Sequence, residues 1–189
     1  MRLVIKYGGT SISAAKDIQA VAKHLNQLSK KNQIAVVCSA TSGTTDDLIE
    51  ISESIKKENK SKAEQLASKI TNRHKQLAKQ TIKKSDIRKK LLTKYDEDFA
   101  ELVALIDGMV LLGEVTPRTM DYLFSFGERL SIKLISSAIN DSGIKSIPLT
   151  GKDVGIVTDS NFGESKPLID TTRLRVSKTV DTLFSKKTI

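Results

Sequence analysis

Near its start the sequence reads RLVIKYGGTS over residues 2–11, and this stretch decides the fold. Residues 2–7 form a short apolar, β-rich run that ends at two glycines, so they predict a buried strand that stops in a tight turn. Apolar residues then recur at helical spacing over about residues 14–29, and hydroxyl side chains at positions 10, 11 and 13 are candidate caps for that helix. Residues 34–38, IAVVC, predict a second apolar strand. A strand, a helix and a strand in this order predict a βαβ unit with parallel strands.

The remaining sequence adds mostly helices to this unit. Apolar spacing, together with caps and breakers, predicts helices over about residues 46–58, 60–80, 86–112, 117–141 and 170–184. Two short apolar segments, residues 144–149 and 155–158, predict further strands, and Thr188-Ile189 resembles the beginning of another. The expected fold is therefore α/β, with three α/β/α layers, a mainly parallel sheet and a helical insertion at about residues 60–112.

Length and composition exclude several classes of protein. The 189 residues suffice for one domain, and 39% hydrophobic with 28% charged residues is the balance of a soluble globular chain rather than a disordered one. No apolar run exceeds five residues, which is too short for a membrane span or a secretory signal. The single cysteine, Cys38, cannot form an internal disulfide, and the expected compartment is the cytoplasm.

The net charge of +9 is concentrated in one segment. Residues 56–94 contain fourteen Lys or Arg and three acids, so this segment carries +11 and the rest of the chain −2. Such a run is most often the solvated surface of helices. The alternative is a basic module that binds nucleic acid or an acidic partner through Lys56–Lys94. Aromatic residues make up only 4% and there is no Trp, which disfavours stacking on single strands.

The first candidate site follows the first predicted strand. Gly8 and Gly9 would let the backbone approach a ligand closely, and their N–H groups before a helix favour an anion. Lys6 adds a positive charge, and the hydroxyls of Thr10 and Ser11 can donate to phosphate or carboxylate oxygens. The alternative is an ordinary tight turn beside a surface lysine. Neither a GxxxxGK[ST] phosphate loop nor a GxGxxG dinucleotide fingerprint occurs in the chain.

Two further candidates lie later in the chain. Residues 39–46, SATSGTTD, leave the second predicted strand and should reach the same carboxyl edge of the sheet, where their hydroxyls could bind a small polar substrate. Helix capping is the alternative there. The segment Gly127-Glu128-Arg129 places a glycine inside a helix, at a cost of about 1 kcal/mol relative to alanine. Glu128 could pair with a substrate ammonium group, whereas spacing alone favours a structural ion pair between Glu128 and Arg129.

Metal and thiol chemistry have little support in the sequence. The two histidines, His24 and His74, lie on different predicted helices, so no metal-ligand cluster is expected. His74 continues an apolar stripe four residues after Ile70 and is expected at the edge of the core. Cys38 has no base near it in sequence and is expected to be a buried thiol.

Taken together and in this order, the motifs resemble those of the aspartokinases in the amino-acid kinase family. The opening K-[FY]-G-G-T-S of that family matches residues 6–11, and its V-[VS]-x-S-A-x-x-G-x-T-D-x-L segment resembles residues 36–48. Its G-E-x-[LM]-S helix resembles residues 127–131, and residues 157–163 look like a late segment of its substrate half. The resemblance runs over essentially the whole chain and implies a mainly parallel sheet between helical layers.

The resemblance also implies an activity. It is the ATP-dependent phosphorylation of the side-chain carboxylate of L-aspartate to 4-phospho-L-aspartate, the first step towards lysine, threonine and methionine. ATP would enter as its Mg²⁺ complex. On the matching motifs, Lys6 would contact the transferring phosphate. The other carried-over residues would bind phosphate (Gly8, Gly9, Thr10, Ser11) or hold aspartate (Ser39, Thr45, Glu128).

The chain departs from the family in what it does not contain. A later G-R-G-G-S-D segment, the adenine-binding part and the regulatory ACT domains do not occur in residues 1–189. The expectation is therefore an amino-terminal, substrate-side portion of the kinase domain, with no turnover by itself and no tightly bound cofactor. Expected partners are L-aspartate and ATP, without nucleic acid or membrane, and a homo-oligomer is compatible with the resemblance.

Overall fold

The computed structural model describes residues 1–186 of the chain. Its elements are β1 (Arg2–Tyr7), the 3-10 helix η1 (Gly9–Ile12), α1 (Ala15–Ser29), β2 (Gln33–Cys38), α2 (Thr44–Lys56), α3 (Lys60–Thr81), α4 (Ser85–Leu112), α5 (Pro117–Asp141), α6 (Gly151–Val154) and α7 (Ile169–Ser185). The predicted α/β class is confirmed, with a small parallel sheet in a helix-rich chain. No helix within this described part is long and apolar enough to cross a membrane.

The sheet consists of β1 and β2, which run parallel. Their register extends from Arg2 opposite Gln33 to Tyr7 opposite Cys38, so both strands end at the same edge. α1 connects the two strands and buries its apolar stripe against them, as expected for a βαβ unit. The two turns that leave this edge are therefore neighbours in space.

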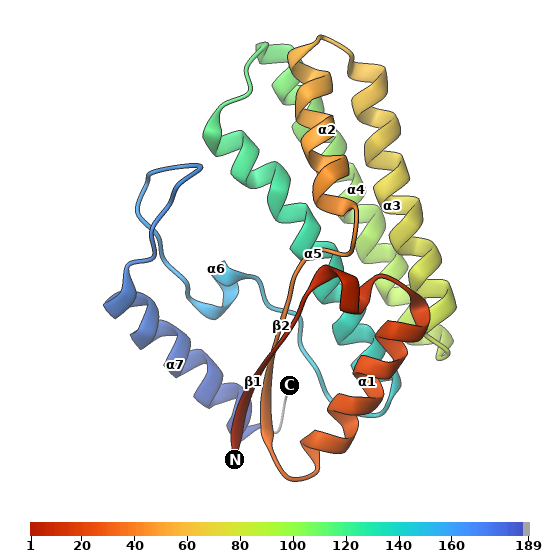
Figure 1. Cartoon of the computed structure of the whole chain (residues 1–189), viewed down its shortest axis with the longest axis vertical. Coiled ribbons are helices and arrows are strands. Elements are labelled where there is room, and N and C mark those ends of the chain that lie inside the picture. The colour runs from red at the N-terminus through yellow and green to blue at the C-terminus, as the bar shows by residue number, and fades with distance from the viewer. Residues whose placement is uncertain (187–189) are drawn as a thin grey trace.

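A second helix lies against the beginning of the other face of the sheet, while Val4 and Val37 farther along that face stay exposed. α7 pairs with β1 through Asp181 and Arg2, whose charged atoms lie 2.7 Å apart. It also accepts a hydrogen bond at the Phe184 carbonyl oxygen from the Gln33 side chain, at 3.3 Å. Figure 1 shows the strands between α1 on one side and α7 on the other. The predicted three-layer order is thus present around a two-stranded sheet.

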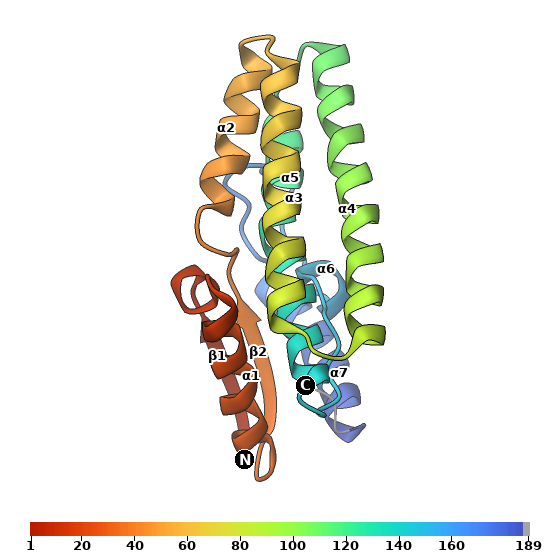
Figure 2. The same ribbon diagram turned by 90° about the vertical axis from the view of Figure 1, so that its right-hand side faces the viewer.

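The helices α2, α3, α4 and the first half of α5 extend away from the sheet as an arm, which Figure 2 shows from its long side. Their shared core is fully or almost fully buried and includes Leu66, Ile70, Tyr95, Leu102 and Phe126. Burying one such side chain stabilises the fold by about 1.5–3 kcal/mol. The hydroxyl of Tyr95 is also satisfied, because it donates to the Leu130 carbonyl oxygen at 3.1 Å.

The helices lie close to the positions predicted from the sequence, but the cap of α1 differs from the prediction. All six helices predicted from apolar spacing lie within two residues of the expected bounds. Thr116 caps α5 by accepting from the Thr119 N–H at 3.2 Å, and Pro117 is its first residue, as predicted. The hydroxyls expected to cap α1 do not do so, since its N-cap is Ala14. The 3-10 helix η1 intervenes and takes up the hydroxyl-rich turn instead.

The strands predicted at residues 144–149 and 155–158 are wrong. Asn140 at the end of α5 holds Ser146 from both sides, accepting from its N–H at 3.0 Å and donating to its carbonyl at 2.9 Å. These bonds occupy backbone groups that a sheet would need. Thr150 then caps α6, and from there to residue 186 the structure has one antiparallel bridge, between Thr158 and Pro167. The strand start predicted at residues 188–189 lies outside the described residues.

Candidate functional site at the carboxyl edge of the sheet

Two loops meet where the strands end. The first loop (residues 8–14) follows β1, and the second loop (residues 39–43) follows β2. The start of the second loop is bonded to the last residue of β1, because the Ser39 N–H donates to the Tyr7 carbonyl oxygen at 3.1 Å. The first loop closes on itself through the Ser11 N–H and the Gly8 carbonyl oxygen at 3.0 Å. The expectation that these loops share one edge is confirmed.

Ala40 in the second loop is the point on which the sequence motifs converge. A Cβ at Gly9 would lie 2.6 Å from the Ala40 carbonyl oxygen, and one at Gly127 would lie 2.8 Å from the Ala40 Cβ. Both glycines are therefore required by close packing of three chain segments. The Glu128 carboxylate accepts a hydrogen bond from the Ala40 N–H at 3.2 Å. Nearby, the Ser131 hydroxyl donates to the Ser39 carbonyl oxygen at 2.7 Å. The glycine inside α5 thus allows the second loop to approach the helix closely.

The predicted site residues differ in how they face solvent. Most of them are exposed at or beside this edge, namely Lys6, Gly8, Thr10, Ser11, Thr45 and Glu128, whereas Gly9 and Ser39 are half-buried. Lys6 lies opposite Val37, on the face of the sheet where Val37 is also exposed. A lysine, several hydroxyl residues and one carboxylate at or beside this edge are therefore exposed to solvent.

A buried polar group that sequence reasoning missed lies directly beneath the second loop. It consists of Thr41, Thr44, Arg73 and His74, and the three residues other than Arg73 are buried. The Thr41 hydroxyl contacts the Thr44 hydroxyl at 2.8 Å and His74 Nε2 at 3.1 Å. Arg73 donates to the Thr44 hydroxyl at 2.9 Å and pairs with Asp47, also at 2.9 Å. His74 is inside the core rather than at its edge, and its position four residues after Ile70 was the signal that could have indicated a polar contact there.

The ion pair that spacing favours between Glu128 and Arg129 is not formed. Arg129 instead turns to α4, where it donates to Glu101 at 2.9 Å and lies 3.2 Å from the buried Asp98. Its guanidinium also sits 4.4 Å from the centre of the Phe126 ring. Hydrogen bonding to Arg129 lowers the pKa of Glu101. Successive helix positions point about 100° apart, which leaves Glu128 free to face the loop while its neighbour holds the arm.

The late segment singled out in the sequence, residues 157–163, packs elsewhere on α5. The Gly163 N–H donates to Asp121 at 2.9 Å, and Arg118 lies 5.4 Å from the centre of the Phe162 ring. Asp121 precedes Glu128 by two helical turns, about 10 Å along the axis. This segment therefore borders α5 on the amino-terminal side of Glu128.

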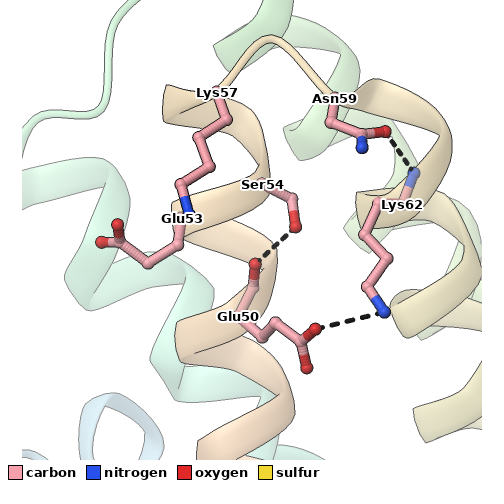
Figure 3. Close-up of a pocket in the computed structure, with 6 residues that line it drawn as sticks. All are labelled: Glu50, Glu53, Ser54, Lys57, Asn59 and Lys62. Atoms are coloured by element: carbon pink, nitrogen blue, oxygen red, sulfur yellow. Dashed lines mark hydrogen bonds and ion pairs between the residues drawn. The ribbon is translucent and has the colours of Figure 1, made fainter.

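The basic segment forms α3 and the first part of α4, and acids from other elements offset part of its charge. Lys60 pairs with Asp107 at 2.7 Å, and Lys62 pairs with Glu50 at 3.2 Å. Figure 3 shows the second pair in a pocket at the far end of α2 and α3, lined by Glu50, Glu53, Ser54, Lys57, Asn59 and Lys62. None of the predicted site residues lines this pocket. The middle of α3 contacts the second loop through His74 and the first residue of α2 through Arg73.

Thiol chemistry at Cys38 and metal binding are the two remaining possibilities that the sequence raises. Cys38 is buried at the end of β2, and burial raises the pKa of its thiol to about 11, which keeps it protonated and unreactive at neutral pH. Among residues 1–186, no group of three or more His, Cys, Asp or Glu side chains is arranged to hold a metal ion.

Comparison with known proteins identifies relatives over the whole chain. The model of the amino acid kinase family matches residues 1–189. Aspartokinase 1, chloroplastic, of Arabidopsis thaliana is 31% identical over 162 residues, which is 84% of this chain and 27% of that protein. The aspartokinase of Schizosaccharomyces pombe is 33% identical over 150 residues, 76% of this chain and 29% of that protein. The chain thus spans less than a third of the length of these two relatives, and it matches their amino-terminal portion.

Solved structures share the fold. Escherichia coli aspartokinase III in complex with aspartate and ADP superposes with a TM-score of 0.75 at 19% identity, covering 95% of this chain and 38% of that one. The same enzyme in complex with lysine and aspartate gives a TM-score of 0.78 at 18% identity, covering 97% of this chain and 38% of that one. At this level of identity the likeness establishes the fold.

Proposed function

This chain belongs to the amino acid kinase family, and from that membership we propose that it forms the aspartate-binding side of an aspartokinase. The proposed reaction transfers the γ-phosphoryl group of ATP to the side-chain carboxylate of L-aspartate, giving 4-phospho-L-aspartate and ADP. The observation that carries the proposal is the convergence of Gly9, Gly127 and Glu128 on Ala40, which joins three motifs of the family at one edge of the sheet.

Glu128 is proposed to bind the ammonium group of L-aspartate. Its side chain is exposed, yet it is anchored by the hydrogen bond from the Ala40 N–H at 3.2 Å, so the charge has a defined position. Hydrogen bonds to a charged group are about twice as strong as neutral ones. The hydroxyls of Ser39, beside Ala40 in the second loop, and of Thr45, in the first turn of α2, are proposed to donate to the carboxylates of the substrate.

Lys6 is proposed to offset negative charge on the phosphoryl group during transfer. Gly8 and Gly9 supply backbone N–H donors in this role, and Thr10 and Ser11 supply hydroxyls. In the reaction a carboxylate oxygen of aspartate forms a bond to the γ-phosphorus while the bond to the β,γ-bridging oxygen breaks. The substrate carboxylate is ionised at neutral pH, since its ordinary pKa is about 4. Catalysis therefore needs positioning and charge stabilisation rather than a strong base, and Mg²⁺ enters with ATP as part of the substrate.

The 189-residue chain is proposed to bind L-aspartate without turning it over. Phosphoryl transfer requires both substrates to be held in line, and a single lysine with a few amide donors cannot orient a whole nucleotide. Residues 60–112 are proposed to be a helical insertion in the kinase domain. Binding of nucleic acid is not expected, because lysines of the basic segment already pair with acids such as Asp107 and Glu50.

Binding of L-aspartate to the purified chain tests the substrate assignment. Titration with L-aspartate should shift the backbone amide resonances of Ala40 and of its neighbours in the second loop. Succinate, which lacks the ammonium group, and D-aspartate, which presents it in the wrong direction, should bind much more weakly. An unchanged Ala40 resonance in millimolar L-aspartate would rule out the assignment.

Activity is tested in a chimera in which residues 1–189 replace the matching segment of a curated aspartokinase. The chimera should form aspartyl hydroxamate with ATP, whereas the 189-residue chain should not. Lys6→Ala in the chimera should lower kcat more than it raises KM, because the lysine is proposed to act in the transition state. Full activity of the Lys6→Ala chimera would refute the role of Lys6, and turnover by the isolated chain would refute its proposed inactivity.

A further inference from the structure

His74 is a buried titratable group that the proposed chemistry does not use. It lies on α3, is 0% exposed, and meets the ring of Tyr95 edge-on with the ring centres 5.9 Å apart. Both of its ring nitrogens are nevertheless within hydrogen-bond distance of a partner. Nδ1 lies 2.8 Å from the Ile70 carbonyl oxygen, and Nε2 lies 3.1 Å from the Thr41 hydroxyl.

These two contacts fix which nitrogen carries the proton. A carbonyl oxygen can only accept, so Nδ1 of His74 must be the donor to Ile70. The ring is neutral at ordinary pH because its pKa is lowered to about 4, chiefly by burial and in smaller part by the charge of Arg73, against the opposing effect of the Ile70 bond. In a neutral imidazole only one nitrogen is protonated, and Nε2 therefore accepts from Thr41.

The direction of this bond propagates along the neighbouring hydroxyls. Since the single hydroxyl hydrogen of Thr41 is directed to His74, the 2.8 Å contact with Thr44 requires Thr44 to donate. Thr44 in turn accepts from Arg73 at 2.9 Å. The donors therefore follow one another in a single direction: Arg73 donates to Thr44, Thr44 donates to Thr41, and Thr41 donates to His74. Thr41, Thr44 and His74 are 3%, 0% and 0% exposed, so water does not compete for these bonds.

We infer that His74 is a positioning residue for the second loop, which it holds in its substrate-binding conformation by accepting the Thr41 hydroxyl hydrogen. The inference rests on the proposed function in one respect, namely that Ser39 and Thr45 contact aspartate. Thr44 and Thr45 are consecutive at the start of α2, and one faces the core while the other faces solvent. Anchoring the Thr44 hydroxyl inside therefore fixes the direction in which Thr45 points. Ser39 lies two residues before Thr41, at the start of the loop, and its backbone is held by hydrogen bonds to Tyr7 and Ser131.

Substitutions at Thr41 test the inference with little change in volume. Thr41→Val removes the hydroxyl and leaves His74 Nε2 without a donor, so amide hydrogen exchange at residues 41–45 should become at least about tenfold faster. Thr41→Ser keeps the hydroxyl and should restore slow exchange. The matched control is Thr71→Val on α3, because the Thr71 hydroxyl is also buried but bonds only to the Ala67 carbonyl oxygen at 3.0 Å within the same helix. That variant should leave exchange in the second loop unchanged.

Two further measurements make the result independent of variant folding and of the proposed function. The nitrogen resonances of His74 in the unsubstituted chain should show the tautomer protonated on Nδ1, and protonation on Nε2 would overturn the inference. L-aspartate affinity should fall with Thr41→Val and recover with Thr41→Ser. If the unsubstituted chain binds no L-aspartate but the exchange pattern holds, the proposed substrate is wrong and the positioning of the loop by His74 stands. If Thr41→Val exchanges as slowly as the unsubstituted chain, the positioning role is wrong whatever the substrate.

Discussion

The carboxylate of Glu128 accepts a hydrogen bond from the backbone N–H of Ala40 at 3.2 Å, across 88 positions of sequence. The bond joins α5 to the loop that leaves β2, next to the loop that leaves β1. It uses one side of a carboxylate that is otherwise open to solvent. A charge held in this way is available to a ligand at little cost in side-chain ordering, because the protein has already restricted its motion.

Two substitutions of Glu128 separate its charge from its contact with the loop. Glu128→Gln keeps an oxygen that can accept from Ala40 but removes the charge, so L-aspartate affinity should fall about tenfold to hundredfold. Glu128→Ala removes both and should weaken binding further. Calorimetric titration measures both effects, and succinate serves as the control ligand because it has no ammonium group to lose. Equal L-aspartate affinity in Glu128→Gln and the unsubstituted chain would exclude a role for the charge.

Replacement by alanine should lower the stability of the fold at Gly9 but not at the adjacent Gly8. A Cβ at Gly9 would lie 2.6 Å from the backbone oxygen of Ala40, so Gly9→Ala must displace one of the two loops and should destabilise the fold by about 1–3 kcal/mol. Gly8 has nothing within 4 Å of an added Cβ and an extended backbone that alanine adopts freely. Gly8→Ala should therefore leave the free energy of unfolding in urea nearly unchanged. Similar losses in both variants would contradict the close packing of the loops.

Much of the fold follows from local patterns in the sequence. The βαβ order placed the two loops at one edge, since parallel strands joined by a helix end on the same side. Apolar spacing and the cap at Thr116 gave the helices nearly residue by residue. The motif positions were predictable for the same reason, because each motif directly follows a strand or lies in a strongly periodic helix.

Contacts between segments far apart in sequence were not predictable. Spacing paired Glu128 with Arg129, but the partners of Arg129 lie on α4, and nothing local indicates which helices pack together. His74 is predicted at the edge of the core, but the second loop contacts it through Thr41 and the residue is fully buried. The strand expected at residues 144–149 is absent because side-chain bonds of Asn140 occupy backbone groups of Ser146 that sheet pairing would use.

The ion pairs among Arg129, Asp98, Glu101 and Lys133 should stabilise the arm. Asp98 is almost fully buried and is held by Arg129 at 3.2 Å and by Lys133 at 2.6 Å. Removing one partner leaves a buried carboxylate less well compensated, so Arg129→Ala should destabilise the fold by about 2–3 kcal/mol in urea unfolding. The matched control is Lys94→Ala, which breaks an exposed pair with Glu97 on the same helix as Asp98 and should leave stability unchanged. Equal effects of the two variants would show that the cluster contributes no more than a surface ion pair.

Stability should decrease as the pH falls from about 6.5 to about 4, in part through His74. The pKa of this histidine is about 4 in the folded chain, against an ordinary value of 6.5. Above pH 6.5 neither state binds the extra proton, so His74 adds no pH dependence there. Between the two values the unfolded chain takes up a proton that the folded chain excludes, which favours unfolding, and the loss levels off below pH 4 at roughly 3 kcal/mol.

His74→Gln has no group to titrate, so the difference in unfolding free energy between it and the unsubstituted chain should change by this amount between pH 7 and pH 4. Parallel profiles for the unsubstituted chain and His74→Gln would mean that His74 is protonated equally in both states, contrary to its burial and to its bond with Thr41.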